Sequence, residues 1–412
     1  MRINWRTSTW GDEISLEYGK ALRFYHPEKG EYRVYGSNGP IGWTQEPLTQ
    51  GPGVILGRKG AYRGVEFSKN PFWVIDTAYY VRTKSDIDIR WLYYAIKFHK
   101  LGEIDDGSPI PSTTRSAVYV RKFKIPSKYE QVSIARILGS LDDKIELNRK
   151  TNETLEAMAR TLFQAWFVDF EPVRAKMEGR WKRGKSLPGL PAHLYDLFPD
   201  RLVGSDERES PDGWIFGQLS SICNLNPESW TKRNRPQSIH YIDLSNTKLG
   251  RIEQISEYKI ENAPSRAQRI LLKNDTILGT VRPENCSYAL VHDNGLTGST
   301  GFAVLRPKKS IYTEIVYLSA TSQSNIDRLS ALADGAAYPA VRPEVVLETI
   351  IPQIPDELII EFSKTANPLL TSIAENEKMS RTLSQLRDTL LPRLMSGELR
   401  IPDAERIAGE AL

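Results

Sequence analysis

Apolar residues recur at alternating intervals of three and four along two long segments of the chain, a spacing typical of coiled-coil helices. In the first segment this spacing selects Ile134, Leu138, Leu141, Ile145, Asn148, Asn152, Leu155, Ala159, Leu162 and Trp166. In the second it selects Phe362, Ala366, Leu369, Ile373, Asn376, Ser380, Leu383, Arg387, Leu390 and Leu394. Each segment is therefore predicted to form one long helix with a mostly apolar seam.

The two segments are copies of each other. Leu141 aligns with Leu369, and the alignment continues along both segments without a gap. The same offset pairs Pro111 with Pro339 upstream, so the chain is duplicated. Because the chain returns between the copies, we expect the helices to pack as an antiparallel coiled coil. Its seam would be formed by Leu141, Ile145, Asn148, Leu155, Leu162, Leu369, Ile373, Asn376, Leu383 and Leu390.

Two asparagines, Asn148 and Asn376, stand at equivalent positions of the predicted seam. A buried polar residue in a coiled coil commonly fixes the register at some cost in stability. The alternative is that both side chains face solvent on a slightly rotated helix.

The start of each helix is marked by a proline and a polar capping residue. Pro126 precedes Ser127-x-x-Glu130, a capping box, and Pro355-Asp356 supplies an aspartate cap in the second copy. Gly139-Ser140 aligns with Asn367-Pro368, where asparagine followed by proline is a good helix start. We therefore expect a short helix, then a kink or break at these positions, and then the long helix.

The remaining sequence is rich in glycine, proline and aromatic residues, with short β-type runs such as residues 53–57 and 275–279. This pattern predicts mainly β domains with long loops. The expected fold class is α+β: two mainly β domains separated by two long helices, with a pseudo-two-fold internal repeat. The expected divisions are a first β domain at 1–125, a first helical region at 126–178, a linker at 179–213, a second β domain at 214–350, a second helical region at 351–400 and a tail at 401–412.

Composition narrows the class of protein without naming a partner. Hydrophobic residues make up 40% and charged residues 26%, as in a globular chain, and no apolar run approaches the length that would span a membrane. The net charge of +4 permits a nucleic-acid partner without requiring one. The only cysteines, Cys223 and Cys286, match no metal-binding spacing, so we expect a reduced cytoplasmic setting.

The order of these parts resembles the specificity (S) subunit of Type I restriction-modification systems, over essentially the whole chain. The strongest stretch is Ile125-Pro126-x4-Gln131-x2-Ile134-x3-Leu138-x2-Leu141-Asp142. It is followed by Leu162-Phe163-x2-Trp166-Phe167-Val168-Asp169-Phe170-x-Pro172, then by Leu197-Phe198-Pro199 and Pro211-x-Gly213-Trp214. Single pieces are weak signals, but their order together with the duplication is specific.

The resemblance implies that each β domain is a target recognition domain that reads one half of a split site in double-stranded DNA. The helices would set the spacing and dock methyltransferase subunits, two of them, while an endonuclease and translocase subunit completes the complex. The resemblance also implies that this chain is not catalytic and holds no cofactor or metal. S-adenosylmethionine, ATP and Mg²⁺ would belong to the partner subunits.

DNA readers need basic groups for phosphates and polar side chains for base edges, and glycine-rich turns let the backbone approach DNA closely. In the first domain the candidates are Tyr35, Ser37, Asn38, Arg58, Lys59, Tyr62, Arg63, Thr113, Thr114 and Arg115. In the second they are Lys232, Arg233, Asn234, Arg235, Arg282, Asn285, Ser287, Tyr338 and Arg342.

Two other functions stay open at this point. Asp243, Glu257 and Lys259 loosely resemble the carboxylate set of a metal-dependent nuclease, which would cut DNA alone with Mg²⁺. A coiled-coil scaffold that binds only protein would show no sequence-dependent affinity for DNA. The run from Gly179 to Ser186 matches a P-loop pattern but lacks the preceding strand and following helix that a phosphate cradle needs. We therefore assign no catalytic and no metal-binding residue.

Overall fold

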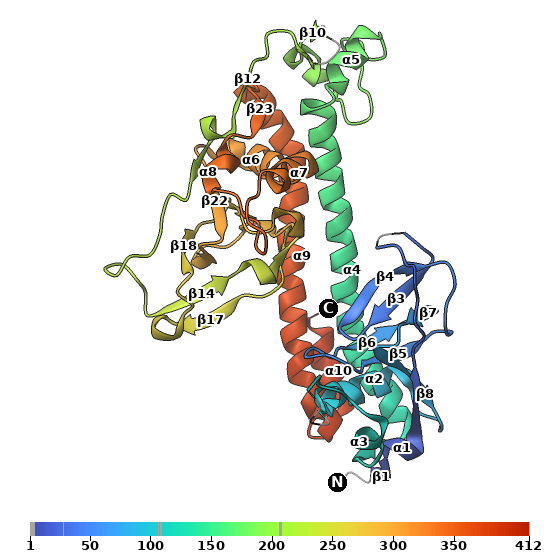
Figure 1. The fold of residues 1–412 in the computed structure, drawn as a ribbon. Coiled ribbons are helices and arrows are strands. Elements are labelled where there is room, and N and C mark those ends of the chain that lie inside the picture. The colour runs from blue at the N-terminus through green and yellow to red at the C-terminus, as the bar shows by residue number, and fades with distance from the viewer. Residues whose placement is uncertain (1–4, 28, 106, 108, 206–207, 412) are drawn as a thin grey trace. The chain divides into compact units, whose positions relative to one another are not determined.

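Two long helices, α4 (Lys128–Phe167) and α9 (Asp356–Ser396), run through the computed structural model, which describes residues 5–27, 29–105, 107, 109–205 and 208–411. The chain divides into two compact units (Figure 1). The first unit comprises Met1–Arg149 and Glu377–Leu412, and the second comprises Lys150–Asn376. Each unit therefore contains one β domain and one half of each long helix.

The β domain of the first unit is built on a four-stranded antiparallel sheet in the order β2-β8-β5-β6. A three-stranded sheet, β4-β3-β7, contains one parallel pair, and β1 pairs with β9. The strands are β1 (Arg6–Thr9), β2 (Ile14–Tyr18), β3 (Tyr32–Gly36), β4 (Gly39–Thr44), β5 (Gly53–Gly57), β6 (Val65–Ser68), β7 (Phe72–Val74), β8 (Ala78–Thr83) and β9 (Lys122–Ile125). The shorter helices are α1 (Trp10–Glu13), α2 (Ile89–Phe98), η1 (Leu101–Glu103), α3 (Arg115–Tyr119) and α10 (Ile401–Gly409).

The second β domain repeats this topology with one strand added to its other sheet. Its four-stranded sheet has the equivalent order β13-β22-β19-β20, and its other sheet, β17-β14-β21-β18, again contains one parallel pair. The strands are β10 (Leu202–Ser205), β11 (Arg208–Pro211), β12 (Phe216–Gln218), β13 (Cys223–Leu225), β14 (Ser238–Ile242), β15 (Thr247–Lys248), β16 (Arg251–Ile252), β17 (Ser256–Lys259), β18 (Ala267–Leu271), β19 (Thr276–Gly279), β20 (Tyr288–Leu290), β21 (Leu296–Ser299), β22 (Phe302–Pro307) and β23 (Ile350–Pro352). The helices are α5 (Glu171–Met177), η2 (Ala192–Leu197), η3 (Leu219–Ser221), η4 (Leu244–Asn246), η5 (Ile260–Asn262), η6 (Pro283–Asn285), η7 (Ser310–Tyr312), α6 (Thr313–Ala320), α7 (Gln323–Ala331) and α8 (Pro343–Leu347).

The predicted α+β fold class and internal repeat are confirmed. Helix α8 corresponds to α3 in the repeat, and strand β23 corresponds to β9. Both pairs are separated by the same number of residues as the aligned positions of the two long helices. The duplication therefore includes the β domains as well as the helices.

The long helices pack antiparallel in each unit, as partners along them show. In the first unit, Arg387 donates to Asp142 (2.7 Å) and Asn148 donates to Ser380 (3.2 Å). In the second unit, Asn376 donates to Asn152 (2.8 Å). Partner numbers on α9 fall as those on α4 rise. Of the predicted seam residues, Leu141, Asn148, Ile373, Leu383 and Leu390 are buried, and Ile145, Leu155, Leu162, Leu369 and Asn376 are half-buried.

The core of the first unit joins the β domain to the helix pair. Trp10 stacks on Phe123 with 3.9 Å between ring centroids, and both belong to a cluster that includes Leu138 of α4 and Leu383 of α9. The predicted tail also contributes to this core, because Ala404 and Ala408 of α10 are buried in the same cluster.

The predicted break near Gly139 is wrong, because α4 runs continuously through it. Gly139 instead provides room for a neighbour: Arg90 of α2 donates to its carbonyl oxygen (2.9 Å), and an added Cβ would lie 2.4 Å from the Arg90 guanidinium carbon. Arg90 also binds Asp143 on the next turn. The glycine therefore serves the packing of α2 on the helix.

The predicted break at Asn367-Pro368 is wrong for a similar reason, because α9 is also continuous. The Asn367 amide donates to Glu314 of α6 (2.7 Å), a tertiary contact rather than a helix cap. Gly139 and Asn367 are equivalent in the repeat, so each β domain docks a helix at the same place on a long helix but uses different side chains.

The capping box at the start of α4 is confirmed. The Ser127 backbone N–H donates to Glu130 (2.9 Å), and the Glu130 N–H donates back to the Ser127 hydroxyl (3.4 Å). Asp356, predicted as the cap of α9, lies inside its first turn instead. Its carboxylate accepts from Lys309 (2.6 Å) and Tyr312 (2.9 Å), so it ties the helix start to the loop before α6.

The core of the second unit is rich in aromatic rings from the end of α4. Phe167 lies 5.0 Å from Phe362 of α9 between ring centroids, and Phe170 lies 5.9 Å from Trp214. The predicted linker at 179–213 is folded onto this core, because its Trp181 and Leu194 are buried in the same cluster. The segment is therefore a packed part of the second unit.

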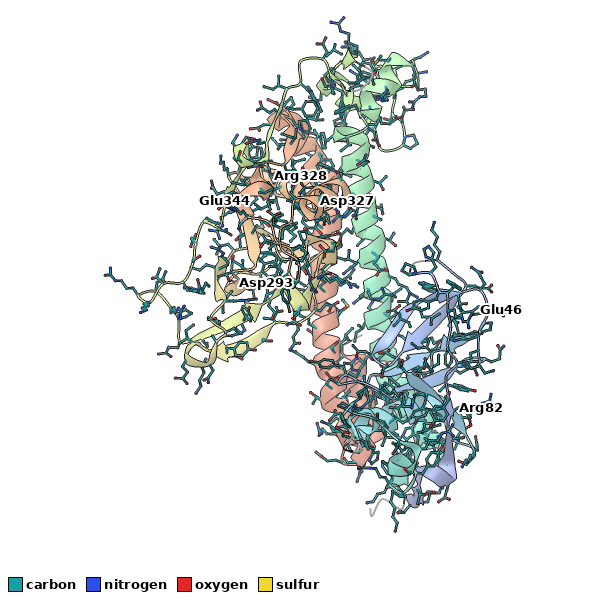
Figure 2. The ribbon with its side chains drawn as sticks, in the orientation of Figure 1. Glu46, Arg82, Asp293, Asp327, Arg328 and Glu344 are labelled. Atoms are coloured by element: carbon teal, nitrogen blue, oxygen red, sulfur yellow. The ribbon has the colours of Figure 1, made fainter. Side chains whose placement is uncertain are left out.

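Polar contacts within the second unit connect α7 with α8 and with the turn between α8 and β23. Arg328 of α7, labelled in Figure 2, donates to the Val345 carbonyl oxygen (3.0 Å) and to the Thr349 hydroxyl (3.0 Å). Arg160 of α4 donates to the carbonyl oxygen of Thr321 (3.0 Å).

Across the described part of the chain, every helix is too short or too polar to cross a membrane.

Candidate nucleic-acid interface

A pair of backbone hydrogen bonds brings two candidate loops of the first domain together. The Gly60 N–H donates to the Pro111 carbonyl oxygen (3.0 Å), and the Thr113 N–H donates to that of Arg58 (2.9 Å). We call this reciprocal pair the clip. It joins the loop after β5 to the loop before α3, although the two loops are far apart in the sequence.

The second domain contains the same clip. The Arg282 N–H donates to the Pro339 carbonyl oxygen (2.7 Å), and the Val341 N–H donates to that of Thr280 (2.9 Å). Pro339 and Val341 are the equivalents of Pro111 and Thr113 in the repeat, and both loops follow an Ile-Leu-Gly strand end. The duplication has therefore kept the backbone of this site while its side chains changed.

Arg58 and Arg115 of the first domain converge on one aromatic ring. The guanidinium carbon of Arg115 lies 4.2 Å from the ring centroid of Tyr18, and that of Arg58 lies 5.1 Å from it. Arg58 also donates to the Asp76 carbonyl oxygen (2.8 Å), and Glu17 lies 3.8 Å from Arg115. Two cations thus share Tyr18 with one nearby carboxylate, which leaves the cluster positively charged.

A second tyrosine lies beneath this cluster. Burial raises the pKa of Tyr79 to about 12, so its hydroxyl stays protonated at neutral pH. The hydroxyl donates to the Thr113 carbonyl oxygen (3.3 Å), which connects the ring to the clip.

Three other first-domain candidates are exposed beside the clip. Asn38 lies in the turn between β3 and β4, and Lys59 and Tyr62 lie in the loop after β5, where 78% of Tyr62 is exposed. Ser37 donates to the Lys59 carbonyl oxygen (2.5 Å), so it ties the two turns together. Thr114 caps α3 by accepting from the Ala117 N–H (3.3 Å).

Three predicted first-domain contacts must be corrected. Tyr35 is buried in the sheet core with its ring edge-on to Phe72. Thr113 is fully buried and donates to the Ile104 carbonyl oxygen (3.1 Å). Arg63 donates to the carbonyl oxygens of Gly60, Gly102 and Ile104, so its guanidinium holds loops together. We therefore remove these three residues from the candidate DNA contacts.

In the second domain, the side chains of Arg282 and Tyr338 are exposed beside the clip. The Arg282 guanidinium donates to the Ala337 carbonyl oxygen (2.7 Å), and its central carbon lies 4.9 Å from the ring centroid of Tyr338. Asn285 is exposed on the same turn, while Ser287 donates to the Leu244 carbonyl oxygen (3.0 Å). Arg342 is exposed at the start of α8, the position of Thr114 in the repeat.

The basic loop that precedes β14 belongs to a different part of the second domain. Lys232, Arg233 and Arg235 are exposed, and Asn234 shapes the loop by accepting from the Thr231 N–H (2.6 Å). The preceding Trp230 N–H donates to the Gln268 carbonyl oxygen (2.8 Å), which anchors the loop on β18 rather than on the clip.

One exposed loop of the first domain escaped sequence reasoning. Between β2 and β3, Arg23, Phe24 and Tyr25 are exposed, with 88% of Phe24 accessible to solvent. The loop begins at Lys20, whose N–H donates to the Val74 carbonyl oxygen (2.9 Å). Its signal in the sequence is a basic residue directly followed by two aromatic residues, a combination that occurs in nucleic-acid binding segments.

The nuclease alternative gains no support from the structure. The Asp243 carboxylate caps a short helical turn by accepting from the Asn246 N–H (3.1 Å), and Glu257 lies on β17 opposite His240. Among the described residues, there is no cluster of three or more His, Cys, Asp or Glu side chains that could hold a metal ion.

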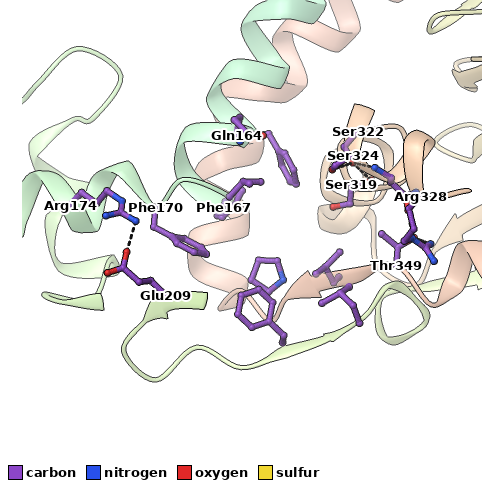
Figure 3. Close-up of a pocket in the computed structure, with 17 residues that line it drawn as sticks. Gln164, Phe167, Phe170, Arg174, Glu209, Ser319, Ser322, Ser324, Arg328 and Thr349 are labelled. Atoms are coloured by element: carbon purple, nitrogen blue, oxygen red, sulfur yellow. Dashed lines mark hydrogen bonds and ion pairs between the residues drawn. The ribbon is translucent and has the colours of Figure 1, made fainter. Parts of the chain in front are cut away.

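A cavity of about 560 Å³ opens in the second unit (Figure 3). Phe167 and Phe170 lie on one side, and Ser319, Ser322 and Arg328 lie on the other. Its charged groups are already engaged: Arg174 pairs with Glu209 (2.6 Å), and Arg328 donates to the Thr349 hydroxyl (3.0 Å). We assign this cavity no chemistry.

Comparison with known proteins gives consistent matches. A family model described as Type I restriction modification DNA specificity domain matches residues 3–157. The chain is 25% identical to the MjaIX specificity subunit of Methanocaldococcus jannaschii, over 96% of this chain and 88% of that protein. It is 26% identical to the HindI specificity subunit of Haemophilus influenzae, over 73% and 74% of the respective chains. A solved S subunit from M. genitalium has the same fold, with a TM-score of 0.56, 18% identity, and coverage of 95% of this chain and 96% of that one.

The corrected role of Arg63 predicts a loss of stability when its guanidinium is removed. Arg63→Met retains an apolar stem but removes the guanidinium hydrogen bonds to the carbonyl oxygens of Gly60, Gly102 and Ile104. We expect a cost of about 1.5–3 kcal/mol in the free energy of unfolding, measured by urea titration. The neighbouring Tyr62→Ala should cost less than about 0.5 kcal/mol, because Tyr62 is exposed. Unchanged stability of Arg63→Met together with altered DNA recognition would show instead that Arg63 faces DNA.

Proposed function

We propose that this chain acts as a member of the family of Type I restriction-modification specificity subunits. In this role, each of its two β domains reads one half of a bipartite DNA site. The observation that supports this most directly is the clip. The same two backbone hydrogen bonds hold a loop after an Ile-Leu-Gly strand in both domains, yet the exposed side chains on them differ. One frame carrying two sets of side chains suits two different half-sites.

The exposed residues beside each clip fit base recognition. Asn38, Lys59 and Tyr62 serve this role in the first domain, and Arg282, Asn285 and Tyr338 serve it in the second. Arg, Lys and Asn side chains form hydrogen bonds with base edges in the major groove. The glycine-rich or tightly turned backbone at both clips lets these side chains approach the groove.

Contacts to phosphates come from the remaining basic groups. The Arg58 and Arg115 pair on Tyr18 serves this role in the first domain. Lys232, Arg233 and Arg235, with Asn234 shaping their loop, serve it in the second, together with Arg342. Such contacts position a protein on the duplex without reading its sequence.

The long helices dock the partner subunits and set the spacing between half-sites. Helices α4 and α9 are continuous over 40 and 41 residues, as suits a connector between two domains. They expose apolar side chains that a partner would cover: Val132, Leu147, Met158, Ile360 and Met379. Two recognition domains on such a connector would read half-sites about one helical turn of DNA apart.

Catalysis belongs to the partners in this proposal. Two methyltransferase subunits supply S-adenosylmethionine chemistry, and endonuclease subunits supply the steps that use ATP and Mg²⁺. The chain itself contributes sequence recognition. A cytoplasmic location suits such a complex and is consistent with the two free cysteines, Cys223 and Cys286.

Methylome sequencing tests this function. The chain would be co-expressed with its cognate methyltransferase subunit in a host without DNA methylation, and modified bases would be mapped by single-molecule sequencing. We expect a split motif with a gap of fixed length, because two domains on one connector read two half-sites. A well-expressed complex that leaves no motif would contradict the proposal and favour a protein-binding scaffold.

The phosphate role of Arg58 and Arg115 predicts a uniform effect on affinity. Arg58→Ala or Arg115→Ala should weaken binding of the complex to all DNA sequences, and should lower the slope of log affinity against log salt by about 1 for each variant. Competition binding at several salt concentrations measures both quantities. Arg82→Ala is the matched control, because Arg82 is an exposed arginine on β8 that stacks on Tyr80 instead (Figure 2). A change in the preferred first half-site would assign the two arginines to base reading instead.

A further inference from the structure

We propose that Arg282 is the residue of the second domain that reads a guanine in the second half-site, and that the clip holds its backbone in an unfavourable conformation for this purpose. This inference rests on the function proposed above and assigns one specificity-determining residue to it. It follows from comparing one backbone position between the two copies of the clip.

The backbone at residue 282 is left-handed, with φ +48° and ψ +66°. Few residues with a side chain adopt this region, because the Cβ atom approaches the carbonyl oxygen that follows. The equivalent residue in the first domain is Gly60, which also has a positive φ, +106°. The clip therefore demands a positive φ in both domains, and the first domain meets the demand with the residue best suited to it.

The sequence around Arg282 adds to the constraint. Pro283 follows it directly and narrows the conformations open to the preceding residue. The Arg282 N–H is bound to the Pro339 carbonyl oxygen, and its own carbonyl oxygen accepts from the Asn285 N–H (2.9 Å). Glycine would satisfy both backbone bonds, so the frame does not require an arginine. Its presence indicates that the side chain is needed.

The side chain is fixed but not neutralised. One guanidinium nitrogen donates to the Ala337 carbonyl oxygen (2.7 Å), and the Tyr338 ring, which is 72% exposed, lies against the guanidinium. Among the described residues, the side-chain partners of Arg282 are this carbonyl oxygen and this ring, and no carboxylate forms an ion pair with it. The charge therefore stays available to an outside acceptor, and the side chain loses little freedom on binding.

This chemistry fits the major-groove edge of guanine. A planar guanidinium presents parallel N–H donors that match the O6 and N7 acceptors of guanine, the commonest specific contact of arginine in DNA complexes. The bond to Ala337 uses one of the two Nη2 hydrogens, and the other Nη2 hydrogen still forms a parallel pair of donors with a neighbouring guanidinium nitrogen. The positioned fork thus predicts a G·C pair in the second half-site.

Arg282→Gly separates this role from folding, because the first domain already closes the same clip around a glycine. The complex with methyltransferase should assemble and unfold at a temperature no lower than wild type. Its preference for guanine at one position of the second half-site should fall by about tenfold or more, with the first half-site unchanged. Methylome sequencing and competition with single-base variants of the motif measure both half-sites in one experiment.

Two further variants sharpen the result. Arg282→Lys keeps the charge but loses the planar fork, so its preference for guanine should be weaker than that of wild type. A preference retained in both the lysine and the glycine variants would overturn base reading by Arg282 in favour of a phosphate contact. Arg282→Asn tolerates the left-handed backbone and replaces the glycine variant if that one fails to assemble. If wild-type complex yields a split motif and Arg282→Gly retains both half-sites, the inference fails while the proposed function stands. If wild-type complex yields no split motif, the proposed function itself fails.

Discussion

Burial of the helix seams is the interaction on which the rest of the structure depends. Neither long helix has a partner within its own segment, so each must bury its apolar face against the other and against a β domain. In the first unit, Leu138 and Leu383 from the two helices share a core with Trp10 and Phe123 of the β domain. In the second unit, Phe167 of α4 and Phe362 of α9 share a core with buried residues of the second β domain. Loss of the helix pairing would therefore also expose the apolar residues of each β domain that pack against the helices.

The two domains share this arrangement of the backbone but differ in their loops and in the side chains that dock them on the long helices. The backbone bonds of the clip are the same in both copies, and so is the strand order of the larger sheet, β2-β8-β5-β6 in the first domain and β13-β22-β19-β20 in the second. The docking contacts and loops differ: Arg90 meets Gly139 in the first unit, where Glu314 meets Asn367 in the second. Keeping a backbone scaffold while changing exposed side chains is how one architecture can acquire two specificities.

The sequence predicted the elements that depend on periodic patterns. The heptad spacing located both helices and the seam, since burial of one face requires that spacing. The breaks predicted from local sequence at Gly139 and Asn367 are wrong, because tertiary contacts at these positions outweigh local helix preferences. In such cases a single sequence does not reveal which neighbour will fill the space beside a glycine.

Individual site residues were harder to predict, because their role depends on burial and on partners distant in sequence. Tyr35 and Thr113 have the chemistry of DNA contacts but lie in the core, and Arg63 is occupied by backbone carbonyl oxygens. Tyr18 was missed because its importance arises only when Arg58 and Arg115 converge on its ring. Residue type and loop position thus selected candidate loops, while the fold shows which side chains in these loops are exposed.

The central claim, that each β domain reads its own half-site, can be measured by site-specific photo-crosslinking. A benzoylphenylalanine would replace Tyr62 in one preparation and Tyr338 in another, since both side chains are exposed and lie close to a clip. Each preparation, assembled with methyltransferase, would be irradiated on one DNA duplex that carries the full split motif. We predict that position 62 crosslinks to bases of one half-site and position 338 to bases of the other. Crosslinks from both positions to the same half-site, or equally to unrelated DNA, would contradict the account.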